Sequence, residues 1–133
     1  MYAFTIGGYD VFVDGIIGPW FLPHWLRAAR GPDATHYVVL RPSRQVALAR
    51  ALTRRAPEAL VDPDPVAKMF NAFEDLGGFE AHVLDTSNLD VDKTVRAIKQ
   101  GLAGGRYLLD PADKPHDMQR LGVKFGIEPP DDP

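Results

Sequence analysis

The chain contains no cysteine. This absence excludes disulfides, thiolate metal sites and cysteine nucleophiles. It also contains no apolar run of membrane-spanning length, and residues 1–8 lack the basic segment and long apolar stretch of a secretory signal. A strong excess of one charge is missing too, since the net charge is −3. These features favour a cytoplasmic protein and indicate neither nucleic acid nor a membrane as a partner.

The length and composition are those of one folded domain. The chain has 133 residues, of which 45% are apolar and 25% charged, and this is enough for one hydrophobic core. Proline and glycine separate the predicted elements rather than forming a low-complexity tract. We expect a main domain over residues 1–109 and an irregular tail over residues 110–133, where Pro, Asp and Gly are frequent.

Three short apolar runs predict β-strands, at residues 9–15, 36–41 and 81–85. The first run is apolar enough to suit a strand buried on both faces of a parallel sheet.

Four helices are predicted between and after these strands. The first covers residues 19–30, and the second follows Ser43, which is a typical N-cap residue. The third starts at Asp64-Pro65 and ends before Gly77-Gly78, and the fourth follows Asp90. The third helix has one apolar stripe, Val66, Met69, Phe70, Phe73 and Leu76, in which Met69, Phe70 and Phe73 are predicted to lie in the core. The fourth has the apolar residues Val91, Val95, Ile98 and Leu102 on one face.

The alternation of strands and helices predicts an α/β fold with a parallel sheet and helices on both faces. In such sheets ligands usually bind at the carboxyl ends of the strands. Asp14, Arg41 and Asp85 end the three predicted strands and are therefore expected at that edge.

Three motifs resemble parts of small P-loop kinases related to chloramphenicol phosphotransferase, gluconate kinase and shikimate kinase, a group that includes many AAA-type ATPases of unknown substrate. Residues 9–20, YDVFVDGIIGPW, resemble the strand and turn before the acceptor site. Residues 39–43, VLRPS, with the arginines that follow, resemble a strand and an arginine-bearing lid. Residues 82–87, HVLDTS, resemble a strand and the loop beside adenine. The resemblance runs from about Gly8 to Leu109 and implies a three-layer α/β sandwich of the P-loop NTPase class.

The sequence departs from this family at its defining motif. Such kinases bind phosphate with a loop G-x-x-x-x-G-K-[ST], and none of the five lysines here follows a glycine directly. The family pattern is therefore truncated at its N-terminal side. A late recorded start, a part removed or encoded elsewhere, and a degenerate relative all remain open as explanations.

The resemblance implies an ATP-dependent phosphotransferase or ATPase that uses Mg-ATP and a small-molecule acceptor when the P-loop is supplied. The present chain is expected to be inactive alone and to bind no cofactor tightly. The alternative is a non-catalytic protein that keeps the fold for binding or assembly.

The resemblance also implies roles for individual residues. Asp14 is the candidate base or Mg²⁺ anchor, although beside Gly15 it is equally suited to capping a turn. Arg50 and Arg54 are candidate catalytic lid residues and Arg55 a candidate cofactor ligand, because a guanidinium can clamp phosphate oxygens. A solvated helix face is the alternative for these arginines.

Two further pairs belong to the implied substrate and nucleotide sites. Trp20 and His24 are candidate acceptor-binding residues, unless they simply pack a short helix. Thr86 and Ser87 are candidates for the adenine side, unless they form an ordinary polar loop. No histidine has a second ligand at metal spacing, so no zinc site is predicted.

A missing P-loop strand leaves the strands at 11–14 and 37–41 without their shared neighbour. Because unpaired buried backbone groups cost about 1–3 kcal/mol each, something must close this gap. A homodimer with paired or exchanged edges is the first expectation. Direct pairing of the two strands is the second, and insertion of residues 2–6 or 123–127 is a further route.

Overall fold

The computed structural model describes residues 7–23, 35–54 and 62–109. The chain divides into two units. The central unit is Tyr37–Tyr107, and the terminal unit combines Met1–His36 with Leu108–Pro133. Helices and a small parallel sheet make this a mixed α/β protein. The tail predicted at residues 110–133 lies outside the described residues.

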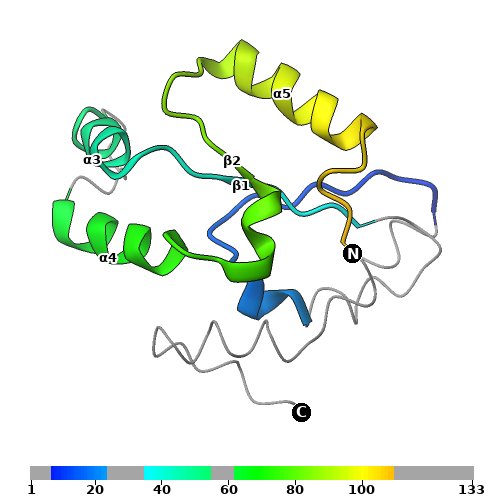
Figure 1. The fold of residues 1–133 in the computed structure, drawn as a ribbon, viewed down its shortest axis with the longest axis horizontal. Coiled ribbons are helices and arrows are strands. Elements are labelled where there is room, and N and C mark those ends of the chain that lie inside the picture. The colour runs from blue at the N-terminus through cyan, green and yellow to red at the C-terminus, as the bar shows by residue number, and fades with distance from the viewer. Residues whose placement is uncertain (1–6, 24–34, 55–61, 110–133) are drawn as a thin grey trace. The chain divides into compact units, whose positions relative to one another are not determined.

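The central unit contains a two-stranded parallel sheet (Figure 1). Strand β1 is Val39–Leu40 and strand β2 is Val83–Leu84, with Val39 opposite Val83 and Leu40 opposite Leu84. The Arg41 N–H continues the pairing by donating to the Leu84 carbonyl at 3.0 Å. Helical segments lie between these strands in the chain, so the predicted parallel pairing across such segments is confirmed for this pair. Strand β2 starts two residues later than the predicted strand at 81–85.

The helices of the central unit begin at capping side chains. Helix α3, Arg44–Leu52, begins after Ser43, whose Oγ accepts from the Val46 N–H at 3.4 Å. Helix α5, Val91–Ala103, begins after Asp90, whose Oδ1 accepts from the Lys93 N–H at 2.8 Å. The predicted cap at Ser43 is therefore confirmed, and Asp90, which was expected only near the start of its helix, is the N-cap of α5.

Helix α4 spans Pro63–Phe73, which corrects both predicted ends. The N-cap is Asp62 rather than Asp64, because the Asp62 Oδ1 accepts from the Asp64 N–H at 3.0 Å and Pro63 takes the first helical position. The helix also ends at Phe73, before Leu76, which was the last residue of the predicted stripe. Gly77, at φ +56°, instead begins the 3₁₀ helix η2, Gly77–His82.

The core of the central unit is built around three rings. Tyr37 meets Phe79 edge to face at 6.2 Å between centroids, and His82 lies 5.8 Å from Tyr37 and 5.7 Å from Phe79. The His82 Nδ1 forms a hydrogen bond of 2.9 Å with the Tyr37 carbonyl. Burial raises the pKa of the Tyr37 phenol, because the phenolate would be poorly solvated there. Leu76 is completely buried beside this part of the sequence.

The two predicted apolar stripes are less buried than expected. The described helix α4 has no fully buried residue, and its stripe is half-buried up to Leu76. On α5 the side chains of Val91 and Val95 are exposed, at 78% and 44%. At the other end of α5, Gly101 lies against the buried ring of Tyr107.

The terminal unit contains the 3₁₀ helix η1, Pro19–Phe21, within the helix predicted at residues 19–30. The rest of that predicted helix lies outside the described residues from position 24 onward. His36 and Leu108 form an antiparallel bridge, and the Leu109 N–H donates to the Thr35 carbonyl at 2.9 Å.

The predicted strand at residues 9–15 is wrong. These residues form no strand, and Phe12 is 91% exposed. A strand of this composition needs neighbours on both edges and cover on both faces. Among the described residues no strand pairs with it.

Candidate functional site

The carboxyl ends of β1 and β2 bring two polar segments to one edge of the sheet. Residues 41–43, Arg-Pro-Ser, follow β1, and residues 85–87, Asp-Thr-Ser, follow β2. Because the strands are parallel and paired in register, both segments leave the sheet at the same edge. Arg41 and Asp85 lie at this edge as predicted. Asp14 is exposed and belongs to the terminal unit.

Arg41 is neutralised within the fold. Its Nη1 donates to the Glu80 Oε1 and its Nη2 to the Glu80 Oε2, both at 2.8 Å, and Nη1 also donates to the Phe73 carbonyl at 2.8 Å. The Glu80 Oε1 accepts a further bond from the Leu76 N–H. The hydrogen bonds from Arg41 hold the pKa of Glu80 below its usual value, and those to Glu80 raise the pKa of Arg41. Arg41 therefore acts as a structural tie between β1 and η2.

Ser87 connects the two segments at the sheet edge. Its Oγ accepts from the Ser43 N–H at 2.8 Å and donates to the Asp85 Oδ1, and its own N–H donates to the same Oδ1 at 2.9 Å. The hydrogen bond from the Ser87 hydroxyl lowers the pKa of Asp85 most, and the bond from the Ser87 N–H lowers it further. Asp85 therefore fixes the turn after β2, and Ser87 attaches that turn to the start of α3.

Arg50 reaches from α3 to the loop after β2. Its Nη2 donates to the Thr86 carbonyl at 2.8 Å and to the Leu89 carbonyl at 3.4 Å, and its Nη1 donates to the Thr86 Oγ1 at 3.4 Å. Thr86 is buried, whereas Arg50 is exposed. The structure thus brings Arg50 next to Thr86 and Ser87, although the sequence analysis assigned Arg50 to the catalytic lid and the other two to the adenine side.

The other candidate residues are placed as follows. Arg54 is exposed just after α3, and Trp20 is buried in the terminal unit. His24 and Arg55 lie outside the described residues. The central unit therefore gathers three of the eight candidates, and a phosphate role for any arginine stays a prediction.

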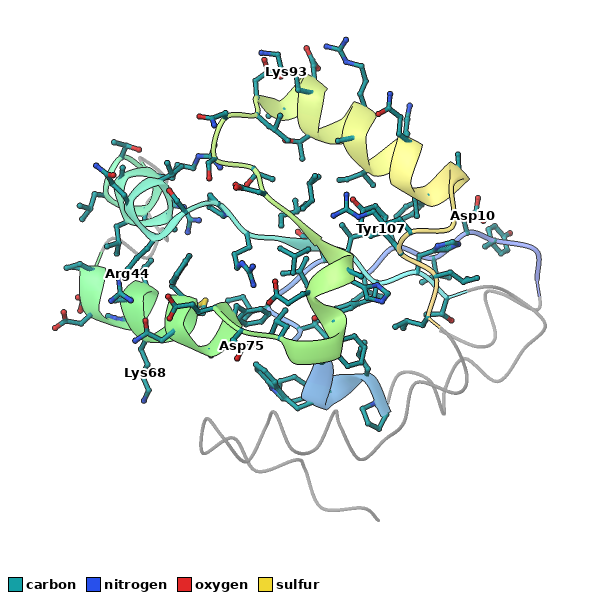
Figure 2. All side chains as sticks on the ribbon, viewed as in Figure 1. Asp10, Arg44, Lys68, Asp75, Lys93 and Tyr107 are labelled. Atoms are coloured by element: carbon teal, nitrogen blue, oxygen red, sulfur yellow. The ribbon has the colours of Figure 1, made fainter. Side chains whose placement is uncertain are left out.

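Two features of this region were not predicted from the sequence. Glu80 lies 39 positions from Arg41, between the glycine pair and the predicted strand at residues 81–85, so no sequence pattern linked them. Arg44 extends from α3 to α4, where it donates to the Asn71 Oδ1 and lies over the Phe70 ring at 5.9 Å (Figure 2). Spacing along one helix cannot reveal such contacts between helices.

Across the part of the chain that the structure describes, no group of three or more His, Asp or Glu side chains is arranged to hold a metal ion. None of the helices in that part is both long and apolar enough to cross a membrane. No protein-family model matches the chain, and no curated protein is significantly similar to it.

Proposed function

We propose that this chain is part of an ATP-dependent small-molecule phosphotransferase domain of the P-loop kinase type, and that the chain alone transfers no phosphate. The observation that carries the proposal is the parallel pairing of β1 and β2, whose carboxyl ends bring Arg41, Asp85 and the hydroxyls of Ser43 and Ser87 to one edge. Nucleotide-binding α/β folds bind their ligands at this edge. A three-layer sandwich is the larger fold that this pair of strands would belong to.

Within this proposal the residues divide by the part of the reaction they serve. Arg50 or Arg54, with Arg55, stabilises charge on the transferred phosphoryl group. A guanidinium suits this role because it can donate two parallel hydrogen bonds to phosphate oxygens. Thr86 and Ser87 lie on the adenine side. By the resemblance to these kinases, Asp14 would correspond to the base for the acceptor, and Trp20 and His24 to acceptor-binding residues.

The residues present fit only part of Mg-ATP. Arg50 offers a cation at the sheet edge, and Ser43 and Ser87 offer hydroxyls. The glycine-rich cradle and its lysine, which supply most contacts to the β and γ phosphates in such kinases, have no counterpart in the sequence. No chemical step is therefore assigned to the nucleotide on this chain alone.

A second function is supported by the internal bonding of the arginines. Arg41 is paired with Glu80, and Arg50 is bonded to backbone carbonyls, so both act as structural ties here. A non-catalytic protein used for binding or assembly would keep the fold in this way. The exposed Phe12 would then contribute to a homodimer with paired or exchanged edges.

The DNA immediately upstream of the first codon separates the two functions. An in-frame strand followed by G-x-x-x-x-G-K-[ST] supports the phosphotransferase. In a protein that includes this segment, Arg54→Ala should lower turnover about 10²-fold with little change in ATP affinity, since the charge on phosphate is largest in the transition state. Arg96→Ala, on the outer side of α5, is the matched control. Unchanged turnover in Arg54→Ala would make Arg54 a surface residue.

A further inference from the structure

The loop between β2 and α5 is held at two points by the segment that follows β1. Arg50 donates to the Thr86 carbonyl at 2.8 Å and reaches Leu89 at 3.4 Å, so one guanidinium spans both ends of the turn at residues 86–89. The Leu89 N–H also donates to the Thr86 carbonyl, at 3.2 Å. The same oxygen therefore accepts both from the turn itself and from Arg50.

Every oxygen that Arg50 bonds is neutral. Its acceptors are the carbonyls of Thr86 and Leu89 and the Thr86 hydroxyl, and across residues 7–23, 35–54 and 62–109 no carboxylate pairs with it. Arg41 differs, since both of its Nη atoms bond Glu80. The bonds from Arg50 to the loop already have one ionised partner, whereas a phosphate would ionise both partners and can accept two parallel N–H bonds from one guanidinium. A phosphate anion can therefore compete with the loop oxygens for Arg50.

The second tie does not depend on Arg50. The Ser43 N–H donates to the Ser87 Oγ at 2.8 Å, and Ser87 is bonded to Asp85. When the Arg50 side chain no longer contacts the loop, the Ser43–Ser87 hydrogen bond still holds the loop next to β2. Loss of Arg50 would then loosen residues 86–89 without separating the loop from the start of α3.

We propose that Arg50 is a latch that holds the loop at residues 86–89 in place, and that a phosphate group competing for its guanidinium releases the loop. Binding of a ligand's phosphate group to Arg50 would therefore loosen the loop at residues 86–89, which lies on the proposed adenine side. The identity of the ligand rests on the proposed function, whereas the contact of Arg50 with the loop does not.

The first experiment measures hydrogen exchange at the Leu89 amide by NMR in Arg50→Gln. Exchange at Leu89 should rise about tenfold or more, because the hydrogen bonds of a charged group are lost. The Phe79 amide, which bonds the Leu76 carbonyl at 3.0 Å, should exchange as before and shows that the fold persists. Arg96→Gln removes the same charge from α5 and should leave Leu89 unchanged. Arg50→Lys should restore part of the protection.

The second experiment adds inorganic phosphate and compares it with sodium chloride of equal ionic strength. Phosphate should accelerate exchange at Leu89 in the native chain and have no effect in Arg50→Gln. Unchanged exchange at Leu89 in Arg50→Gln would overturn the latch, and so would phosphate that slows or does not alter exchange in the native chain. Neither result depends on ATP binding or phosphate transfer, so failure of the latch and failure of the proposed function are distinguishable.

Discussion

Arg41 and Glu80 form two parallel hydrogen bonds of 2.8 Å, one from each Nη atom to each carboxylate oxygen. The pair fixes the end of β1 to the 3₁₀ helix η2, which leads directly into β2. Because Glu80 also accepts from the Leu76 N–H, the same carboxylate holds the segment that follows α4. One ion pair therefore holds the end of β1, the segment after α4 and the helix that leads into β2 together.

Removal of the Glu80 charge should destabilise the chain. Glu80→Gln should cost on the order of 1 kcal/mol at pH 7, a modest value because the pair is partly exposed and screened by solvent. Glu74→Gln removes a nearby charge and should change stability by less than about 0.5 kcal/mol. Urea denaturation measures both, and an equal loss in the two variants would contradict a specific role for the pair.

The contribution of Glu80 should also depend on pH. The folded state lowers the pKa of Glu80, so it binds fewer protons than the unfolded state as pH falls below the ordinary value of 4.5. The stabilisation is present above 4.5 and is lost as pH falls through the lowered pKa. The stability difference between the native chain and Glu80→Gln should therefore shrink in that range. A difference that grew there would contradict this sign.

Gly101 should not tolerate a side chain. A Cβ at this position would lie 2.2 Å from a ring carbon of Tyr107 (Figure 2), and the Tyr107 side chain is fully buried. The clash should outweigh the gain in helix propensity of about 1 kcal/mol, so Gly101→Ala should lose about 1–2 kcal/mol. Gly104→Ala, whose nearest contact would be an ordinary 3.5 Å, is the matched control. A Gly101→Ala chain more stable than the native one would show that Tyr107 can move aside.

Local signals in the sequence predicted the elements of the central unit well. Ser43 caps its helix as expected and Asp90 lies at the start of its helix as expected, because such signals act over only two or three residues. The start of α4 was misplaced because two Asp-Pro pairs, at positions 62–63 and 64–65, carry the same signal. The parallel pairing of β1 and β2 followed from the alternation of elements.

The rest depends on contacts between distant residues, which periodicity does not encode. The tie from Arg50 to Thr86 joins residues 36 positions apart, and the pair of Arg41 with Glu80 spans 39. The apolar run around Phe12 has the composition of a buried strand, but a strand also requires partners, and composition alone does not supply them. The contact of α5 with Tyr107 was not predicted for a similar reason, since Gly101 has no side chain to mark it as a packing position.

Phe12 should take part in self-association. It is 91% exposed, with Val11 at 37% and Val13 at 46% beside it, and a homodimer with paired or exchanged edges would cover this run. Phe12→Asp should therefore shift the chain toward monomer in sedimentation measurements. Val91→Asp adds the same charge at a side chain that is 78% exposed and should leave association unchanged. A native chain that stays monomeric at all concentrations would remove the dimer from the proposal.

The measurement that tests the central claim most directly is calorimetric titration of Mg-ATP into this chain and into a version extended by a strand and a P-loop. The chain alone should bind with a dissociation constant weaker than about 100 μM, because its residues supply no phosphate cradle. The extended version should bind at least about tenfold more tightly. A dissociation constant of about 1 μM for the chain alone, equivalent to about −8 kcal/mol, would contradict the account, and so would an extended version that binds no better.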